Sequence, residues 1–330
     1  MKLFTTLALA AGVALFAWLL SETDLAAVAH TITRVGWLGA VAVVAVWAAG
    51  FAAEIGGWAL LFRQRVLTLR RFVQLWLVNM VGEAFNVVLP LGSLGGEPFK
   101  ALLLRRHYRV PYPDSSSALF LMQTLLALAE APFALIGVIL AVQLPILSTQ
   151  LKTIMIIAVV ILIVLMGLTL LALHKRWLGL FTRELEDSRW SERLIHVTAG
   201  MDEVEDQMFD FVRRDPVRFA TSLGLFFLNW VAGAAEVWVI MQLMGVPLSF
   251  GDCWIMEAAV VLVRSATFFI PANLGSFEAA TVFVAMPFTG SADIGLALAL
   301  VRRARELLWS ALGLAIAGWF NLRGPAEEGP

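Results

Sequence analysis

Residues 86–100 read NVVLPLGSLGGEPFK. The stretch holds an apolar segment that stops at Pro90, a glycine cluster, and two charged residues, Glu97 and Lys100, near its end. Because proline lacks a backbone N–H donor and clashes with the preceding turn, a helix that reaches Pro90 is expected to break there. The stretch therefore predicts two helical arms joined by an irregular break.

A second stretch repeats this pattern later in the chain. The sequence from Thr267 reads TFFIPANLGSFEAA, and aligning Pro271 with Pro90 sets Glu278 opposite Glu97, each seven residues past its proline. Two interrupted apolar segments in corresponding halves are typical of transporters built from an inverted repeat, whose binding site lies at the breaks. Two ordinary helix kinks or extramembrane turns are the alternative, since glycine and proline are frequent in membrane helices.

The composition places the chain in a lipid bilayer. Of its 330 residues, 60% are hydrophobic and 15% are charged, and the mean hydropathy is +0.83; a soluble domain carries about 25% charged residues. The lone Cys253 and the four scattered histidines offer no disulfide and no metal-ligand spacing. No nucleotide-binding motif occurs. We therefore expect no metal, no cofactor and no nucleic-acid partner.

The apolar runs divide the chain into two halves with the same layout of span, span, broken pair, span. We predict spans at about residues 3–20, 36–62, 115–142, 151–173, 217–244 and 293–320, and broken pairs at about 72–104 and 252–286. The fold class is then an all-α polytopic membrane protein. It has about six spanning helices plus two broken or re-entrant helix pairs in an inverted repeat, or eight spans if the pairs are counted differently.

The orientation follows from the layout and from the basic loops. Each half crosses the membrane an odd number of times, so the second membrane repeat, residues 143–330, is expected to be inverted relative to the first, residues 1–142. Lysine and arginine gather in the loops at 63–71 and 105–109 and in the segment 174–218. The positive-inside rule makes that side cytoplasmic and, with it, both termini.

A cytoplasmic insertion at about residues 174–216 interrupts the second half. Apolar residues within it recur at 4–3 spacing, which puts them on one face of a helix; they are Trp190, Leu194, Val197, Met201, Val204, Met208 and Phe211. Such a face packs either on the protein's own cytoplasmic side or at the lipid interface. The alternative is that the 190–211 helix forms a homodimer or binds lipid-synthesis partners.

Ionisable side chains fall inside or beside the apolar runs, where a charge costs about 2.5 to 3.5 kcal/mol on insertion. Glu83 and Arg264 each lie seven residues before a repeat proline, which would allow a salt bridge across the repeat axis. Arginine forks and helix N-termini at the breaks suit an anionic lipid headgroup. An arginine–glutamate network that closes the repeat interface and binds nothing is the alternative. The full set is Glu54, Glu83, Glu97, Lys100, Glu130, Glu236, Glu257, Arg264, Glu278, Arg302, Arg303, Arg305 and Glu306.

Three segments, NVVLPLGSLGGEPFKALLLRR, IPANLGSFEAA and ALVRRARELLWSALG, together resemble the flippase-like transmembrane domain of the lysylphosphatidylglycerol synthase family. The resemblance covers nearly the whole chain and implies lipid translocation or handling in a bacterial cytoplasmic membrane. In its length and compact ends the chain is also similar to the hopanoid-associated HpnL group. Because the sequence stops ten residues past the last span, we expect the family's soluble aminoacyl-transferase domain to be absent.

The resemblance indicates most of the site residues, and the breaks and the arginine cluster add Gly95, Asn273 and Arg302. We expect a membrane lipid to be bound through its headgroup by Glu97, Lys100, Glu278, Arg302 and Arg303. The cavity would be shaped by Pro90, Gly92, Gly95, Gly96, Pro271, Asn273 and Gly275. No catalytic residue is assigned. The favoured function is a lipid flippase linked to hopanoid or anionic phospholipid; the alternatives are a non-transporting scaffold for a lipid-biosynthesis complex and an integral-membrane lipid-modifying enzyme.

Overall fold

The computed structural model describes residues 21, 25–62, 68–88, 95–174, 211 and 215–323. Within these ranges the regular secondary structure is entirely helical. The expected first span and nearly all of the 190–211 helix lie outside the described residues, as do Pro90 and Gly92. The dimer or partner role of that helix therefore stays a prediction.

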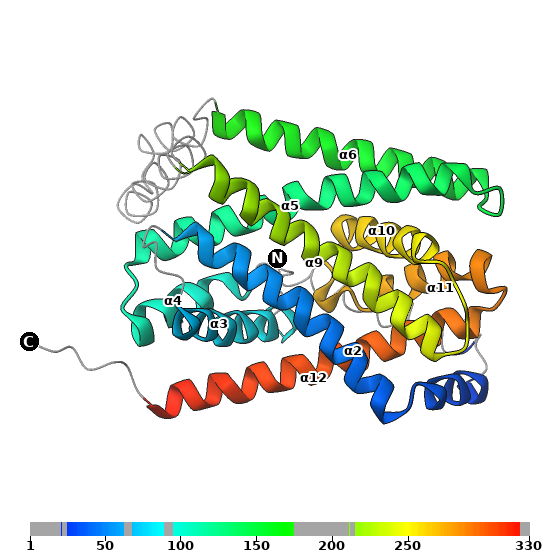
Figure 1. Cartoon of the computed structure of the whole chain (residues 1–330), viewed down its shortest axis with the longest axis horizontal. Coiled ribbons are helices and arrows are strands. Elements are labelled where there is room, and N and C mark those ends of the chain that lie inside the picture. Colours follow the sequence, from blue (N-terminus) through cyan, green and yellow to red (C-terminus); the bar gives the residue numbers. More distant parts are fainter. Residues whose placement is uncertain are drawn as a thin grey trace, which may run out of the picture.

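The described helices form a layered bundle (Figure 1). They are α2 (Leu25–Leu61), α3 (Leu69–Val88), α4 (Glu97–Tyr108), α5 (Tyr112–Gln143), α6 (Thr149–His174), α9 (Pro216–Leu243), α10 (Phe250–Ala266), α11 (Ser276–Thr289) and α12 (Ala292–Arg323), with a 3-10 turn, η2 (Pro271–Asn273), after α10. Helices α5 and α6 run along one edge and α12 along the opposite edge, while α2 and α9 cross between them (Figure 1). Four of these helices, α2, α5, α6 and α9, are long and apolar enough to cross a membrane. The predicted all-α polytopic membrane fold is confirmed.

Each predicted broken pair corresponds to two separate helices in the described part of the chain. Helices α3 and α4 lie at one end of the bundle, and α10 and α11 lie at the other (Figure 1). The second arms begin later than their prolines suggest, at Glu97 and Ser276. The reason at the second break is visible: Ala272 and Asn273 have positive φ angles of 53° and 49°, which no helix accommodates.

The first described helix is longer than predicted. The sequence placed the start of that span at Gly36, whereas α2 begins at Leu25 and is kinked at Gly36, where φ is 60° and ψ is 178°. Only glycine adopts this backbone conformation without strain. The glycine thus marks a bend inside the helix, whereas sequence reasoning took it for the start of the helix.

The two halves are intertwined, because the last helix of each half packs against the other half. Helix α5 packs against α9 and α10, and α12 packs against α2 and α3. Two indole N–H groups reinforce the first contact: Trp230 donates to the carbonyl of Leu126 at 3.1 Å, and Trp254 donates to that of Phe133 at 3.0 Å. An inverted repeat would produce this reciprocal packing, while the boundary at residue 142 stays a prediction.

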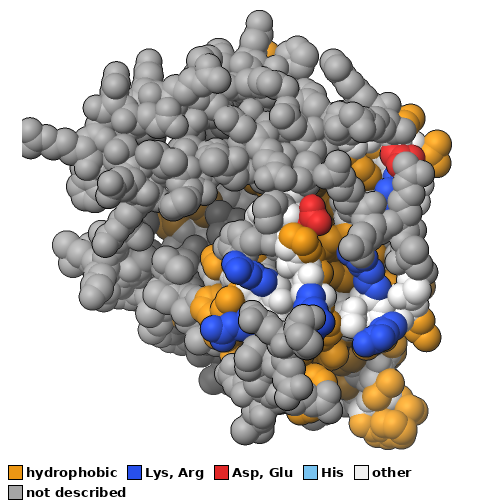
Figure 2. Space-filling model, turned by 90° about the vertical axis from the view of Figure 1, so that its left-hand side faces the viewer, with side chains coloured by type: hydrophobic (Ala, Val, Ile, Leu, Met, Phe, Trp, Pro, Cys, Tyr) orange, Lys and Arg blue, Asp and Glu red, His pale blue; other side chains and the backbone are white. Residues whose placement is uncertain are grey.

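One end of the bundle is basic. Arginines gather where α2 and α4 end and where α3 and α9 begin; they are Arg70, Arg71, Arg105, Arg106, Arg109 and Arg218. Figure 2 looks onto this end and shows Lys and Arg side chains spread across it. Arg218 donates to the carbonyls of Leu60 and Phe62 and so satisfies the C-terminus of α2.

Candidate functional site

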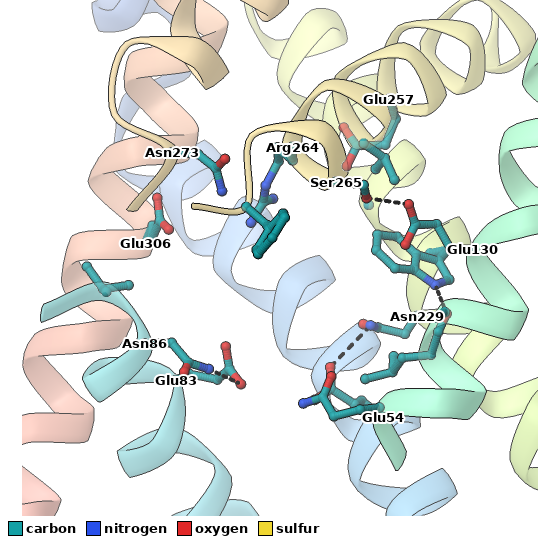
Figure 3. A pocket seen from close by; sticks show the side chains of 18 of the residues that line it. Glu54, Glu83, Asn86, Glu130, Asn229, Glu257, Arg264, Ser265, Asn273 and Glu306 are labelled. Carbon is teal, nitrogen blue, oxygen red and sulfur yellow. Dashed lines mark hydrogen bonds between the residues drawn. The ribbon is translucent and has the colours of Figure 1, made fainter. Parts of the chain in front are cut away.

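A cavity of about 450 Å³ lies between the two helix pairs. Its polar lining comes from six helices and from η2: Glu54, Glu83, Asn86, Gln123, Glu130, Asn229, Glu257, Arg264, Ser265, Asn273, Arg302 and Glu306. Figure 3 shows ten of these residues, among them the guanidinium of Arg264, around a common hollow. Pockets for small ligands measure roughly 300 to 1,000 Å³, so the cavity is large enough for a polar group of that size.

Lys100 joins the two arms of the first pair. Its Nζ donates to Oε1 of Glu83 at 3.0 Å and to Oε1 of Glu97 at 2.7 Å, and its side chain is completely buried. Gln123 of α5 also donates to Oε1 of Glu97, at 2.9 Å. The lysine stem lies directly over Gly82, where any Cβ would overlap it. The buried ammonium group of Lys100 therefore links α4 to α3.

The first break is held by an equally close backbone contact. The Gly96 N–H donates to Oδ1 of Asn86 at 2.6 Å. A Cβ on Gly96 would overlap the carbonyl group of Gly82, so two glycines are needed for the arms to meet. Gly95 is buried beside this contact, just ahead of the first turn of α4.

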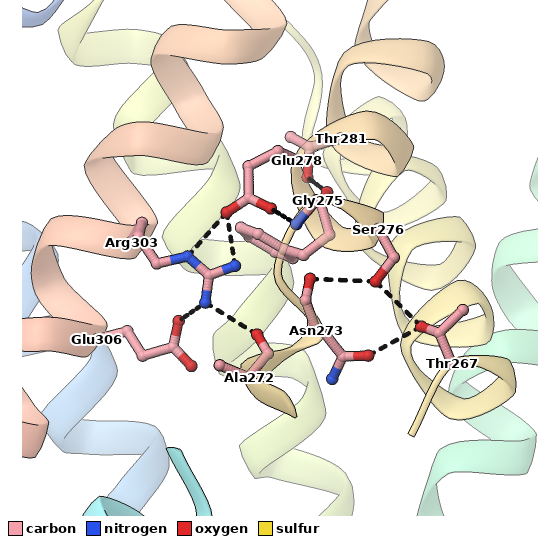
Figure 4. A network of polar contacts seen from close by, with 10 residues as sticks. Thr267, Ala272, Asn273, Gly275, Ser276, Glu278, Thr281, Arg303 and Glu306 are labelled. Carbon is pink, nitrogen blue, oxygen red and sulfur yellow. Dashed lines mark hydrogen bonds and ion pairs between the residues drawn. The ribbon is translucent and has the colours of Figure 1, made fainter. Parts of the chain in front are cut away.

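Arg303 joins α12 to the second break (Figure 4). Its Nε and Nη2 donate to Oε1 of Glu278 at 2.8 and 2.5 Å, and its Nη1 donates to the carbonyl of Ala272 and to Oε2 of Glu306. The other oxygen of Glu278 accepts from the Gly275 N–H at 2.7 Å. This carboxylate thus caps α11 while it neutralises the arginine.

Asn273 supports the same break and faces the cavity. Its Oδ1 accepts from the Thr267 hydroxyl at 2.8 Å, and its carbonyl accepts from the Ser276 hydroxyl at 3.1 Å. Its side chain lines the cavity opposite α5 and α9 (Figure 3). These contacts fix an irregular backbone that a membrane interior tolerates only beside protein or water.

A third network ties α12 to α9 and α10. Arg302 donates in bidentate fashion to Glu257 at 2.6 and 2.8 Å, and its Nε reaches Glu236 at 3.2 Å. Arg305 donates to both oxygens of Glu236, at 2.8 and 3.2 Å. All four residues are buried. These contacts match the alternative reading of the arginine cluster, namely a network that closes the repeat interface.

Three ionisable residues of the lining lack an ion pair with any described residue. Glu54 contacts only side-chain amides, and Glu130 accepts from the Ser265 hydroxyl at 2.5 Å. The Arg264 guanidinium lies 5.8 Å from the ring of Phe277 and points into the hollow (Figure 3). Within the described ranges no group of His, Cys, Asp and Glu residues is arranged to hold a metal ion.

The predicted headgroup contacts lie mostly behind the cavity wall. Among the described residues, Arg302 is the one of that set that lines the main cavity, and Arg303 lines an adjoining hollow of about 80 Å³. Glu97, Lys100 and Glu278 are engaged in the ion pairs described above. Their role as headgroup ligands stays a prediction.

The expected salt bridge between Glu83 and Arg264 is not formed, because Glu83 contacts Lys100 instead. Both side chains nevertheless line the cavity. Among the residues expected to shape the cavity, Asn273 lines it directly. Gly95, Gly96 and Gly275 shape the breaks, and Pro271 begins η2.

Sequence reasoning did not select several lining residues as site residues. They are Glu54, Glu83, Asn86, Gln123, Glu130, Asn229, Glu257, Arg264, Ser265 and Glu306. The available signal was the presence of a polar side chain within an apolar run, which is a functional indication in a membrane. That signal alone does not say which helices face the same hollow.

The fold and the cavity define a helical integral membrane protein with a polar site enclosed between two broken helix pairs. The chain matches the family model described as the lysylphosphatidylglycerol synthase TM region over residues 5–313. It therefore belongs to that family, as the motifs indicated, and is a membrane protein linked to lipid handling. Comparisons with curated proteins and with solved structures found no match.

Proposed function

We propose that this protein is a lipid translocase of a bacterial cytoplasmic membrane. The headgroup of the lipid would occupy the cavity while its acyl chains remain in the bilayer. The family's link to lipid handling supports this, and so does a volume of about 450 Å³, which suits a headgroup and not a whole lipid. The basic end and both termini would face the cytoplasm.

The proposal includes re-entrant helix pairs. Helix α4 has 12 residues and α11 has 14, which correspond to about 18 and 21 Å at 1.5 Å per residue. Both are shorter than the roughly 30 Å hydrocarbon core. Since the pairs lie at opposite ends of the bundle (Figure 1), they would enter from opposite faces and meet at the cavity.

The observation that carries the proposal is the environment of the Arg264 guanidinium. Arg264 faces the cavity without an ion pair among the described residues, whereas Arg302 is held by two glutamates. A guanidinium offers paired N–H donors that match phosphate oxygens. The carboxylates of Glu83 and Glu130, which also line the cavity, would accept hydrogen bonds from headgroup hydroxyls. The lining thus suits a phospholipid with a polar, hydrogen-bonding headgroup.

Leaflet-resolved translocation in proteoliposomes tests this function. The probe is tail-labelled phosphatidylglycerol, and the variants are Arg264→Gln and, as a surface control, Arg106→Gln. Hydrogen bonds to a charged group contribute about 1.5 to 3 kcal/mol, so Arg264→Gln should slow translocation about 10- to 100-fold. The control should match the wild type, because Arg106 is exposed at the end of α4.

A hopanoid polyol without phosphate serves as the second probe. If it moves at the same rate with and without Arg264, the cargo is a hopanoid and the phosphate contact is wrong. Equal phosphatidylglycerol rates in the wild type, in Arg264→Gln and in vesicles without protein would overturn the translocase. Chemical analysis of the recovered probe completes the test, because a modified lipid would indicate an enzyme instead.

A further inference from the structure

Two glutamates at corresponding places in the two halves have different partners. Glu54 of α2 and Glu236 of α9 lie 36 and 35 residues before the repeat prolines. Glu236 is fully buried and receives N–H donors from the guanidinium groups of Arg302 and Arg305. Glu54 has no such counter-charge among the described residues. The charge of the glutamate in the second half is therefore neutralised by arginines, whereas that of the glutamate in the first half is not.

Two amides take the place of the arginines at Glu54, and Figure 3 shows one of them, that of Asn229. Asn79 donates its Nδ2 to Oε1 of Glu54 at 2.9 Å, and Asn229 donates its Nδ2 to Oε2 at 3.2 Å. Asn79 is completely buried, and its Oδ1 accepts no hydrogen bond from any residue the structure describes. A buried acceptor without a hydrogen bond is energetically unfavourable. A second state in which Oδ1 of Asn79 accepts a hydrogen bond would explain its buried position.

The charges nearest to Glu54 do not neutralise it. Glu83, Glu97 and Lys100 interact electrostatically with Glu54, but the ammonium of Lys100 is in contact with the other two carboxylates. Three carboxylates thus share one cation. A carboxylate removed from water without a counter-charge is costly, and such a group commonly takes up a proton.

The other charged groups of the cavity come from α5, α10 and α12. They are Glu130, Glu257, Arg264, Arg302 and Glu306, all of which line the same cavity as Glu54. The glutamates of α10 and α12 and the α12 arginine are fixed in ion pairs. Arg264 and Glu130 form no ion pair with a described residue, but their opposite charges interact with each other, which leaves Glu54 as the lining carboxylate whose charge is least compensated.

We propose that Glu54 binds and releases the proton that drives translocation, with Asn79 as its switch. When Glu54 is ionised, both of its oxygens accept amide N–H groups, as in the structure. When a proton from water converts the carboxylate to the neutral acid, a half-turn of the Asn79 amide presents Oδ1 to the new O–H donor. The orphan oxygen then accepts the O–H of Glu54, and the hydrogen bond from Asn79 Nδ2 to Glu54 is given up in exchange.

Proton binding and headgroup binding are coupled through the shared cavity. Protonation removes a negative charge from the wall that faces an anionic phosphate, so the protonated form binds that headgroup more tightly. By linkage, the phosphate raises the affinity of Glu54 for the proton to the same extent. This coupling rests on the proposed translocase function, whereas the proton site itself rests on the contacts of Glu54.

Infrared difference spectroscopy of the purified protein tests the proton site without any lipid. Near neutral pH exposed glutamates stay ionised, so a carboxylic carbonyl band that grows on mild acidification reports a shielded acid. We expect the wild type and Glu130→Gln to show this band and Glu54→Gln to lose it. No band in the wild type, or a band that persists in Glu54→Gln, overturns the site.

The coupling is tested separately with tail-labelled phosphatidylglycerol in proteoliposomes. We expect an imposed pH gradient, acidic on the side of loading, to accelerate translocation by the wild type and to have no effect on Glu54→Gln. Translocation that ignores the gradient in the wild type overturns the coupling. If the wild type moves no lipid but shows the infrared band, the proposed translocase function and the coupling are both overturned. The proposed proton site is then still supported.

Discussion

Arg302 illustrates at the scale of one residue how this protein keeps charges in its interior. Its guanidinium is 3% exposed, and all of its nitrogens donate to carboxylates. Burying ions costs several kcal/mol each, and their mutual attraction repays this only when the geometry is good and the hydrogen bonds are complete. Here both conditions hold, so the arginine is a structural tie between α12 and the α9–α10 layer.

Replacing this arginine should therefore be more damaging than replacing an exposed one. Arg302→Met leaves Glu236 and Glu257 buried with reduced neutralisation, and breaking a buried pair on one side costs about 3 to 5 kcal/mol. We expect a large drop in the thermal unfolding midpoint, which is measured by tryptophan fluorescence in detergent. Adding Glu257→Gln should restore part of the loss, because it removes one orphaned charge. An unchanged midpoint in Arg302→Met would contradict the structural role.

The two helix pairs show at the scale of elements that one layout is stabilised by different chemistry. The first pair relies on the close approach of α3 and α4. Gly82 and Gly96 are in contact, and Lys100 forms ion pairs with a glutamate on each of the two helices. The second relies on Arg303 from α12 and on a carboxylate cap. A small residue is therefore indispensable at the first break, and a charged partner from another helix is indispensable at the second.

Gly96→Ala tests the close approach of α3 and α4. The new methyl group would overlap the Gly82 carbonyl, so we expect a loss of about 1 to 3 kcal/mol. Gly167→Ala is the matched control, because a Cβ there meets nothing within 4 Å; alanine in an open helical position is neutral or stabilises by up to about 1 kcal/mol. Unfolding midpoints in detergent compare the two. Equal midpoints would show that the arms can separate without cost.

The start of α10 gives a smaller effect of known origin. Ser249 accepts a hydrogen bond from the Asp252 N–H at 3.1 Å, and the Asp252 carboxylate accepts one from the Ser249 N–H at 3.1 Å. This reciprocal cap satisfies two N–H groups that the helix leaves free. Ser249→Ala should cost about 1 kcal/mol, seen as a modest fall in midpoint. Ser249→Asp should retain most of the stability, and an equal fall in both variants would contradict the cap.

At the scale of the whole molecule, sequence reasoning could place the breaks but not the partners across them. The matched positions of Glu97 and Glu278 follow from counting along the chain. The asparagine that holds Glu54 from α9 is 175 residues away, and no local pattern encodes that contact. The same holds for Arg303 and Glu278, since their pairing depends on how α12 packs against the second break. Periodicity and breaks are local, whereas the cavity arises from packing between halves.

The distribution of basic residues is the other property of the whole molecule. Six described arginines lie at the end shown in Figure 2, whereas Arg34 and Lys152 lie at the opposite end, where they donate to the carbonyls of Met244 and Val142. Positive charge resists translocation across the membrane, so the richer end is expected to stay in the cytoplasm. The flanks of the first helix pair would then be cytoplasmic, and those of the second would face outward.

Single cysteines in a Cys253→Ala background test this inverted arrangement. Arg70→Cys and Arg106→Cys flank the first pair, and Pro247→Cys and Ser291→Cys flank the second. We expect a membrane-impermeant maleimide to label the second two on intact spheroplasts and the first two only after permeabilisation, since the charge asymmetry fixes the orientation. The two cysteines that flank the same helix pair must be labelled under the same condition. Labelling of both pairs from the same side would rule out an inverted repeat, and with it a cavity closed by pairs that enter from opposite faces.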